Sequence, residues 1–195
     1  MKIDSFKSLD KVFEPDTEKI ISFEEYYNKV SDISLNNVVP QEIRGHFDIA
    51  KNLMLYSWFV RRFKHVAELH AFSSVEFAIR TKIKITRPDK SRIKNLKPLL
   101  EYAIMQKWII DDGFPEIVKK RKQREEQKTM IEDEIGITYS NYNEIRNDVQ
   151  RLSKTLINLL PTLRNDFAHG SNTMLNSYLD ILNTCRHIIN QLFNK

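Results

Sequence analysis

The sequence predicts an all-α fold, a bundle of long helices, on three observations. Gly and Pro are scarce, at 4 and 6 of the 195 residues, whereas Leu, Ile, Lys, Glu and Asn are plentiful. This balance favours helices, because Gly and Pro are the poorest helix formers and turn-rich sheets use more of both. Apolar residues make up 41% of the chain, and they recur every three or four positions over much of it, as on one face of a helix.

Residues 1–39 are predicted to form an N-terminal lead-in with one short helix. In residues 1–18 the apolar side chains have no regular helical or strand spacing. Ser22 and Glu25 have the spacing of a capping box, so a helix is expected to start there. The pair Asn36-Asn37 is expected to end it, and Pro40 suits the opening of the next helix.

The longest helical pattern extends from Gln41 to Ile85. So long a span favours two helices or one bent helix over a straight rod, and Ser73-Ser74 is a candidate for the bend. Glu76 and Arg80 are four residues apart, and we expect them to form an ion pair on the helix surface. The alternative is that Glu76 supports an arginine in a catalytic groove.

The middle of the chain is predicted to hold two more helical segments between breaks. Residues 86–89 are predicted to form a turn, and residues 95–110 are predicted to form an amphipathic helix. Residues 112–115 contain Gly and Pro and break the chain. Residues 116–134 are highly charged with few apolar anchors, which fits either a solvated helix or a mobile loop.

Two helices are predicted in the C-terminal part. The first is expected to start at residues 141–144, and its apolar stripe runs to Phe167 through Pro161, which predicts a kink at residues 157–161. Gly170 suits the left-handed residue that ends a helix, and Ser171 or Asn172 can cap the next one. The last helix is expected to bury Cys185 among its apolar residues.

Composition excludes several classes of protein. Cys185 is the only cysteine, so no internal disulfide can form and a cytoplasmic location is expected. The first residues lack the apolar run of a signal peptide, and no stretch reaches the roughly 18 apolar residues that span a bilayer. The sequence has no Cys/His cluster with zinc spacing, no Gly-rich phosphate loop and no nucleophile elbow. We therefore expect no metal, no cofactor and no membrane partner.

The segment Leu163–Ser171 carries the clearest functional signal. It contains Arg164, Asn165 and His169 at the end of an apolar helical pattern. Asn165 and His169 are four apart and share a helix face, and the long side chain of Arg164 can reach the same groove. Histidine exchanges a proton near neutral pH, and arginine is a permanent forked cation suited to phosphate.

These three residue types match the needs of RNA cleavage by transesterification. His169 can act as base or acid at the ribose hydroxyl or the leaving oxygen. Arg164 can hold the non-bridging phosphate oxygens, and Asn165 can orient the histidine or the phosphate. One histidine per chain is too few for both proton transfers, so a symmetric dimer that joins two motifs in one groove would complete the site.

The pattern Arg-Asn-x-x-x-His in a small helical protein resembles the motif of HEPN-domain ribonucleases. The resemblance implies that residues 40–195 form a HEPN-like bundle of long antiparallel helices, that two chains pair into a composite site, and that this site cuts RNA without a metal. It further implies a bacterial defence or toxin role, with an antitoxin or regulatory protein as a partner. Residues 68–84 also look like the long helix of abortive-infection HEPN relatives.

A basic segment overlaps the end of the long helical pattern and is nearly unopposed by acidic residues, apart from Asp89. It is predicted to bind the RNA backbone, although a merely solvated surface is the alternative. A second basic run at residues 119–124 is partly balanced by Glu125 and Glu126. The predicted RNA-binding residues are Arg80, Lys82, Lys84, Arg87, Lys90, Arg92 and Lys94.

Two other readings of the motif stay open. Arg164 could pair with Asp166 or a helix carbonyl, and His169 could serve only at the C-terminal end of its helix, where a cation is favoured. The protein would then be a catalytically silent HEPN-like module that binds RNA or a partner protein, or a plain helical interaction domain. Trp58 and Tyr56 are expected to be core residues, and His65 and His70, five apart, do not share a helix face.

Overall fold

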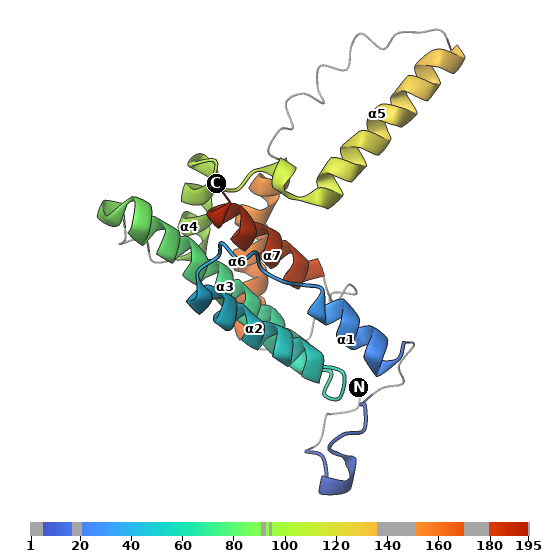
Figure 1. The fold of residues 1–195 in the computed structure, drawn as a ribbon, viewed down its shortest axis with the longest axis vertical. Coiled ribbons are helices and arrows are strands. Elements are labelled where there is room, and N and C mark those ends of the chain that lie inside the picture. The colour runs from blue at the N-terminus through green and yellow to red at the C-terminus, as the bar shows by residue number, and fades with distance from the viewer. Residues whose placement is uncertain are drawn as a thin grey trace. The chain divides into compact units, whose positions relative to one another are not determined.

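The structure is a computed structural model, and it describes residues 6–16, 21–90, 93, 95–135, 151–169 and 180–194. In these ranges the chain forms helices and no strand, so the predicted all-α class is confirmed (Figure 1). The α-helices are α1 (Phe23–Ser31), α2 (Gln41–Tyr56), α3 (Phe63–Thr86), α4 (Leu96–Met105), α5 (Pro115–Ile135), α6 (Arg151–Ala168) and α7 (Asp180–Phe193). Three short 3-10 helices are η1 (Leu9–Lys11), η2 (Pro88–Lys90) and η3 (Asp111–Gly113).

The chain divides into two compact units, and three of the helices contribute to both. Unit 1 comprises Met1–Val75 and Arg164–Arg186, and unit 2 comprises Glu76–Leu163 and His187–Lys195. Unit 1 thus contains α1, α2, the first half of α3, the last residues of α6 and the first half of α7. None of the helices in the described ranges is long and apolar enough to cross a membrane.

The first α-helix of unit 1, α1, starts where the sequence predicts. The Ser22 hydroxyl accepts a hydrogen bond from the Glu25 backbone N–H at 3.1 Å, so the capping residue is confirmed. The helix ends at Ser31, several residues before the Asn36-Asn37 pair, so the predicted end is wrong. Ile33 and Val39 are buried in the non-helical segment that follows, and this burial outweighs continued helix formation.

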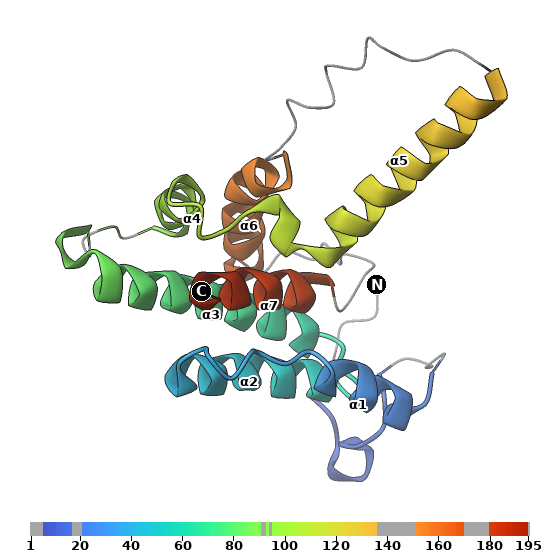
Figure 2. The same ribbon diagram turned by 45° about the horizontal axis from the view of Figure 1, so that its top comes forward.

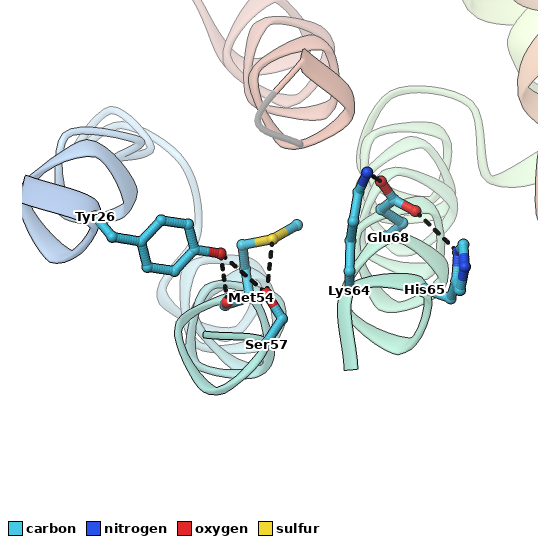
Figure 3. Close-up of polar contacts among 6 residues, drawn as sticks. All are labelled: Tyr26, Met54, Ser57, Lys64, His65 and Glu68. Carbon is cyan, nitrogen blue, oxygen red and sulfur yellow. Dashed lines mark hydrogen bonds and ion pairs between the residues drawn. The ribbon is translucent and has the colours of Figure 1, made fainter. Parts of the chain in front are cut away.

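A buried polar network joins α1 to the end of α2 (Figure 3). The Tyr26 hydroxyl donates to the Met54 carbonyl at 2.8 Å and lies 2.9 Å from the Ser57 hydroxyl. The Ser57 hydroxyl also donates to the Met54 carbonyl, at 2.6 Å. Each oxygen of this network has a partner, which is the usual state of buried polar groups.

The long helical pattern is two helices, which is one of the two predicted alternatives, but the break is not at Ser73-Ser74. Those hydroxyls donate to the carbonyls of Leu69 and His70 one turn earlier, at 3.2 and 2.9 Å, and α3 continues past them. The break lies at residues 57–62 instead. There the lead-in residues Lys7 and Asp16 bind the turn: Lys7 Nζ donates to the Phe59 carbonyl at 2.9 Å, and Asp16 accepts from the Arg61 N–H at 3.0 Å.

In unit 2, α4 stops at Met105, so the helix predicted over residues 95–110 is too long. Lys107 has a φ of 56°, and its N–H donates to the Ile104 carbonyl while the Trp108 N–H donates to the Ala103 carbonyl. This pair of bonds ends a helix on a left-handed residue, a position that usually holds glycine. A side chain there costs roughly 1 kcal/mol, and nothing in the apolar pattern signals it.

The charged residues 116–134 lie within α5, which confirms the helical alternative (Figure 2). Arg121 pairs with Asp111 at 3.5 Å and also with Asp112, both in η3, and this contact fixes the start of the helix. The break predicted at residues 112–115 is confirmed by η3. Gly136 and the helix start predicted at residues 141–144 lie outside the described residues.

Helices α6 and α7 largely follow the predicted apolar stripes. Leu156, Leu160 and Phe167 of α6 are buried, but Leu159 is 46% exposed, and the helix continues through Pro161. In α7, Cys185 is fully buried, as predicted, as are Leu182, Ile188 and Ile189. Gly170, Ser171 and Asn172 lie outside the described residues. Trp58 belongs to the core as expected, whereas Tyr56 is 57% exposed, so that part of the prediction is wrong.

Candidate active site

The three motif residues lie on the last turn of α6 and its immediate end, all in unit 1. The side chains of Arg164, Asn165 and His169 are exposed. Asn165 and His169 are one helical turn apart, and the His169 N–H donates to the Asn165 carbonyl at 2.9 Å. One turn therefore presents a cation, an amide and an imidazole to solvent.

Arg164 interacts with its motif neighbour. Its Nη1 donates to the Asn165 side-chain oxygen at 3.3 Å. The sequence leaves pairing of Arg164 with Asp166 open, but the hydrogen bond in the structure is to the Asn165 amide. A long hydrogen bond at an exposed site is weak, so the guanidinium can exchange it for a phosphate oxygen.

Phe167 anchors this turn. It is 8% exposed, whereas Asn165, Asp166, Ala168 and His169 beside it are exposed. Its ring lies 5.1 Å from the His65 ring and 6.1 Å from the Phe72 ring, centre to centre. The same apolar stripe predicts that Leu163 also faces the core, but Leu163 is only half-buried. The motif turn thus rests on α3 through one aromatic side chain.

Glu76, the predicted supporting residue, pairs on its own helix. Arg80 Nη2 and Nε donate to Glu76 Oε1 at 2.7 and 3.1 Å, which confirms the expected surface ion pair. Arg80 also donates to the Ile93 carbonyl at 2.6 Å. Glu76 and Arg80 belong to unit 2, and a role for Glu76 in the catalytic groove stays a prediction.

The predicted RNA-binding segment is only partly described. The Lys82 ammonium lies 5.8 Å from the ring centres of both Trp108 and Phe193, and Lys84 is exposed. Arg87 is exposed and bonds Asp89 at 3.3 Å, a contact that raises the pKa of its guanidinium. Lys90 ends η2, but its side chain lies outside the described residues, as do Arg92 and Lys94.

The sequence reading missed a buried charged cluster on the first turns of α3, formed by Lys64, His65 and Glu68 (Figure 3). Glu68 is fully buried, and its two carboxylate oxygens lie 3.7 Å from Lys64 Nζ and 3.5 Å from His65 Nδ1. Burial raises the pKa of Glu68 to about 7, although Lys64 acts in the opposite direction. Burial likewise lowers the pKa of Lys64 and outweighs the attraction of Glu68.

A second missed feature is a pair of histidines from different helices. The rings of His46 in α2 and His70 in α3 stack at 4.3 Å with 13° between their planes. His46 Nδ1 lies 2.8 Å from the Ser74 hydroxyl, and His70 Nε2 lies 3.1 Å from the His46 carbonyl. Burial, followed by His70, lowers the pKa of His46. No sequence spacing predicts a contact between residues so far apart along the chain.

In the part of the chain that the structure describes, no group of three or more His, Cys, Asp or Glu side chains is arranged to hold a metal ion. Comparison of the chain with protein-family models, with curated proteins and with solved structures found no match. The HEPN assignment therefore stays a prediction that depends on the motif residues.

Proposed function

We propose that the protein is an endoribonuclease of HEPN type that cleaves RNA without a metal ion. The observation that carries this proposal is the α6 end, where Arg164, Asn165 and His169 are exposed on one turn while Phe167 holds that turn on α3. A reactive group must be open to its substrate and fixed in position, and this turn combines both properties.

The chemistry assigns one role to each side chain. His169 takes the ribose 2′-proton or supplies a proton to the leaving 5′-oxygen. Arg164 stabilises the charge that develops on the non-bridging phosphate oxygens, as a forked donor. Asn165 accepts a hydrogen bond from Arg164, and it orients the guanidinium or the phosphate for the reaction. The attack gives a 2′,3′-cyclic phosphate and a free 5′-hydroxyl, so atoms balance without a water or a metal.

A homodimer completes the proposal, because one histidine cannot be base and acid in the same step. Two chains would place two motif turns in one groove, so that each His169 takes one proton transfer. Lys82, Lys84 and their basic neighbours would bind the RNA backbone. A bacterial defence or toxin context, a cytoplasmic location and an antitoxin or regulatory partner belong to the same proposal.

The test is cleavage of mixed cellular RNA in excess EDTA by the wild-type chain and three variants. We expect His169→Ala to lower the rate by about 100-fold to 10,000-fold, as loss of a general acid or base does. Arg164→Ala should lower it by about 100-fold or more. Asp166→Ala is the matched control, because Asp166 is exposed on the same turn and has no role in the mechanism. Products should carry 2′,3′-cyclic phosphate ends.

Three results would contradict the proposal in different ways. Equal cleavage by wild type and His169→Ala would remove the motif from the reaction. Activity that EDTA abolishes would contradict the metal-free mechanism. Binding of RNA that weakens with salt, without cleavage in any variant, would select the catalytically silent RNA-binding module.

A further inference from the structure

Glu68 is a buried carboxylate in unit 1 whose two oxygens both lack a hydrogen bond to another described residue. Its side chain is fully buried. Lys64 and His65 approach it at 3.7 and 3.5 Å, beyond ordinary hydrogen-bond length. Buried polar groups in native proteins are nearly always bonded, so this carboxyl requires an explanation.

A short series of contacts leads from Glu68 to the motif turn. Glu68 faces His65, one turn earlier on α3 (Figure 3). The His65 ring in turn lies 5.1 Å from the ring of Phe167, centre to centre, with 43° between their planes. Phe167 is the buried anchor between Arg164 and His169. These contacts connect Glu68 to the exposed motif through the rings of His65 and Phe167, all within one compact unit.

Other charged or titratable groups face this cluster from each element around it. On α3 and the turn before it these are Lys64, Arg62 and Arg61. Burial lowers the pKa of His65, and these three cations lower it further. From α7, the charge of Asp180 raises the pKa of Lys64. Burial, and then the charge of Glu68, raises the pKa of the Cys185 thiol, which also belongs to α7. The imidazole of His65 is therefore harder to protonate than a free one, whereas burial raises the pKa of Glu68 to about 7. Ionised Glu68 attracts Lys64 and a His65 N–H, and protonated Glu68 loses that attraction.

We propose that Glu68 is a positioning residue, which through His65 and Phe167 sets the orientation of the α6 turn that carries Arg164, Asn165 and His169. Ionised Glu68 holds the His65 ring, and the turn adopts its working orientation. Protonated Glu68 releases the ring. The effect on RNA rests on the proposed function, whereas the contact series can be measured without RNA.

The first experiment follows ring signals by nuclear magnetic resonance in the full chain labelled at His and Phe. Between about pH 5.5 and pH 8.5, the His65 and Phe167 signals of the wild type should show a step with a midpoint near the Glu68 value of about 7. In Glu68→Gln that step should be absent, and the signals should match those of the wild type at low pH. Glu76→Gln, at a half-buried carboxylate bonded to Arg80, should keep the step.

A second variant keeps the test independent of how well Glu68→Gln folds. His65→Phe preserves a ring beside Phe167 but removes the nitrogen that faces Glu68. In this variant the Phe167 ring signals should keep the chemical shifts of a buried ring, and the step near pH 7 should be absent. A Phe167 step that persists in either variant, or wild-type Phe167 signals that do not respond to pH, would overturn the proposal.

The second experiment measures RNA cleavage by the same proteins across the same pH range. The ratio of wild-type kcat to Glu68→Gln kcat should rise by about tenfold between pH 6 and pH 8, because misplacing catalytic groups by even 1 Å lowers rates strongly. KM should stay within about twofold, since Glu68 is buried and touches no RNA. An unchanged ratio would overturn the positioning role and leave the nuclease proposal intact. A third outcome is that no protein cleaves RNA, while the resonance step is present in the wild type and absent in Glu68→Gln. That outcome would reject the nuclease proposal and support the role of Glu68 in positioning the turn.

Discussion

Unit 1 buries two polar clusters, one where α1 meets α2 and one on the first turns of α3 (Figure 3). In the first, Tyr26, Ser57 and the Met54 carbonyl bond one another at 2.6 to 2.9 Å. In the second, the carboxylate oxygens of Glu68 lie at 3.5 and 3.7 Å from their nearest charged neighbours. The first cluster contains only neutral groups, whereas the second contains ionisable ones.

This difference separates two uses of buried polarity. Neutral hydroxyls and carbonyls that satisfy one another fix the packing of two helices at little cost in free energy. A buried carboxyl and a buried amine are costly in their charged forms, and their mutual attraction does not fully compensate for the lost hydration. The second cluster therefore stabilises the fold less and responds to pH more, and three variants test this comparison.

The largest effect is expected for Lys64→Met. At about pH 8 Glu68 is ionised, and the variant leaves it buried without its cation, which should lower the free energy of unfolding by about 3 to 5 kcal/mol. At about pH 5 Glu68 is protonated, so the loss should be smaller. Urea unfolding at both pH values measures it. The control is Lys29→Met, which breaks the exposed pair with Glu25 at 2.7 Å and should cost less than about 1 kcal/mol.

An intermediate effect is expected in the pH dependence of stability. Because the pKa of folded Glu68 is raised from 4.5 to about 7, the folded state holds the proton more tightly than the unfolded state. Glu68 thus lowers stability as pH rises between these values, by about 3 kcal/mol in all, and adds no further change above pH 7. Thermal unfolding of Glu68→Gln should show a pH profile flatter than that of the wild type by this amount. Parallel profiles would show that Glu68 titrates normally.

The smallest effect is expected for Tyr26→Phe. The variant loses the hydroxyl, but Ser57 still donates to the Met54 carbonyl, so no buried acceptor is left without a donor. We expect a loss of about 1 kcal/mol that is equal at pH 5 and pH 8. Tyr56→Phe is the matched control on α2, since Tyr56 is 57% exposed and should change stability by less than about 0.5 kcal/mol. If the loss of stability in Tyr26→Phe depended strongly on pH, the two clusters would not differ in their response to pH.

The parts of this fold that could be predicted from sequence are those set by local chemistry. The Ser22 cap needs only Glu25, three residues on, and the apolar stripes of α6 and α7 need only helical spacing. The end of α4 could not be predicted, because Lys107 carries no mark of its left-handed backbone. The sequence makes Ser73-Ser74 a candidate for the bend, but their hydroxyls bond within α3, and the break lies at residues 57–62.

The candidate site shows the same division. The sequence placed Arg164, Asn165 and His169 on one exposed turn, because helical spacing alone brings them together. It gave no sign of Glu68, because Lys64 and Glu68 have the same four-residue spacing as pairs that lie on helix surfaces. Only the packing of helices distinguishes a buried pair from an exposed one. The stacking of His46 on His70 joins two helices and is likewise a tertiary feature.

Because Cys185 is buried, the rate at which a thiol reagent labels it can measure how often the core of the native protein opens. Cys185 is the only cysteine in the chain, it is fully buried, and burial raises the pKa of its thiol, so the reactive thiolate is rare in the closed state. A thiol reagent would then modify the native chain only when the core around α7 opens, and the labelling rate would measure that opening directly. A cysteine introduced on the exposed motif turn would react first, so a fluorophore could be attached there without removing Cys185.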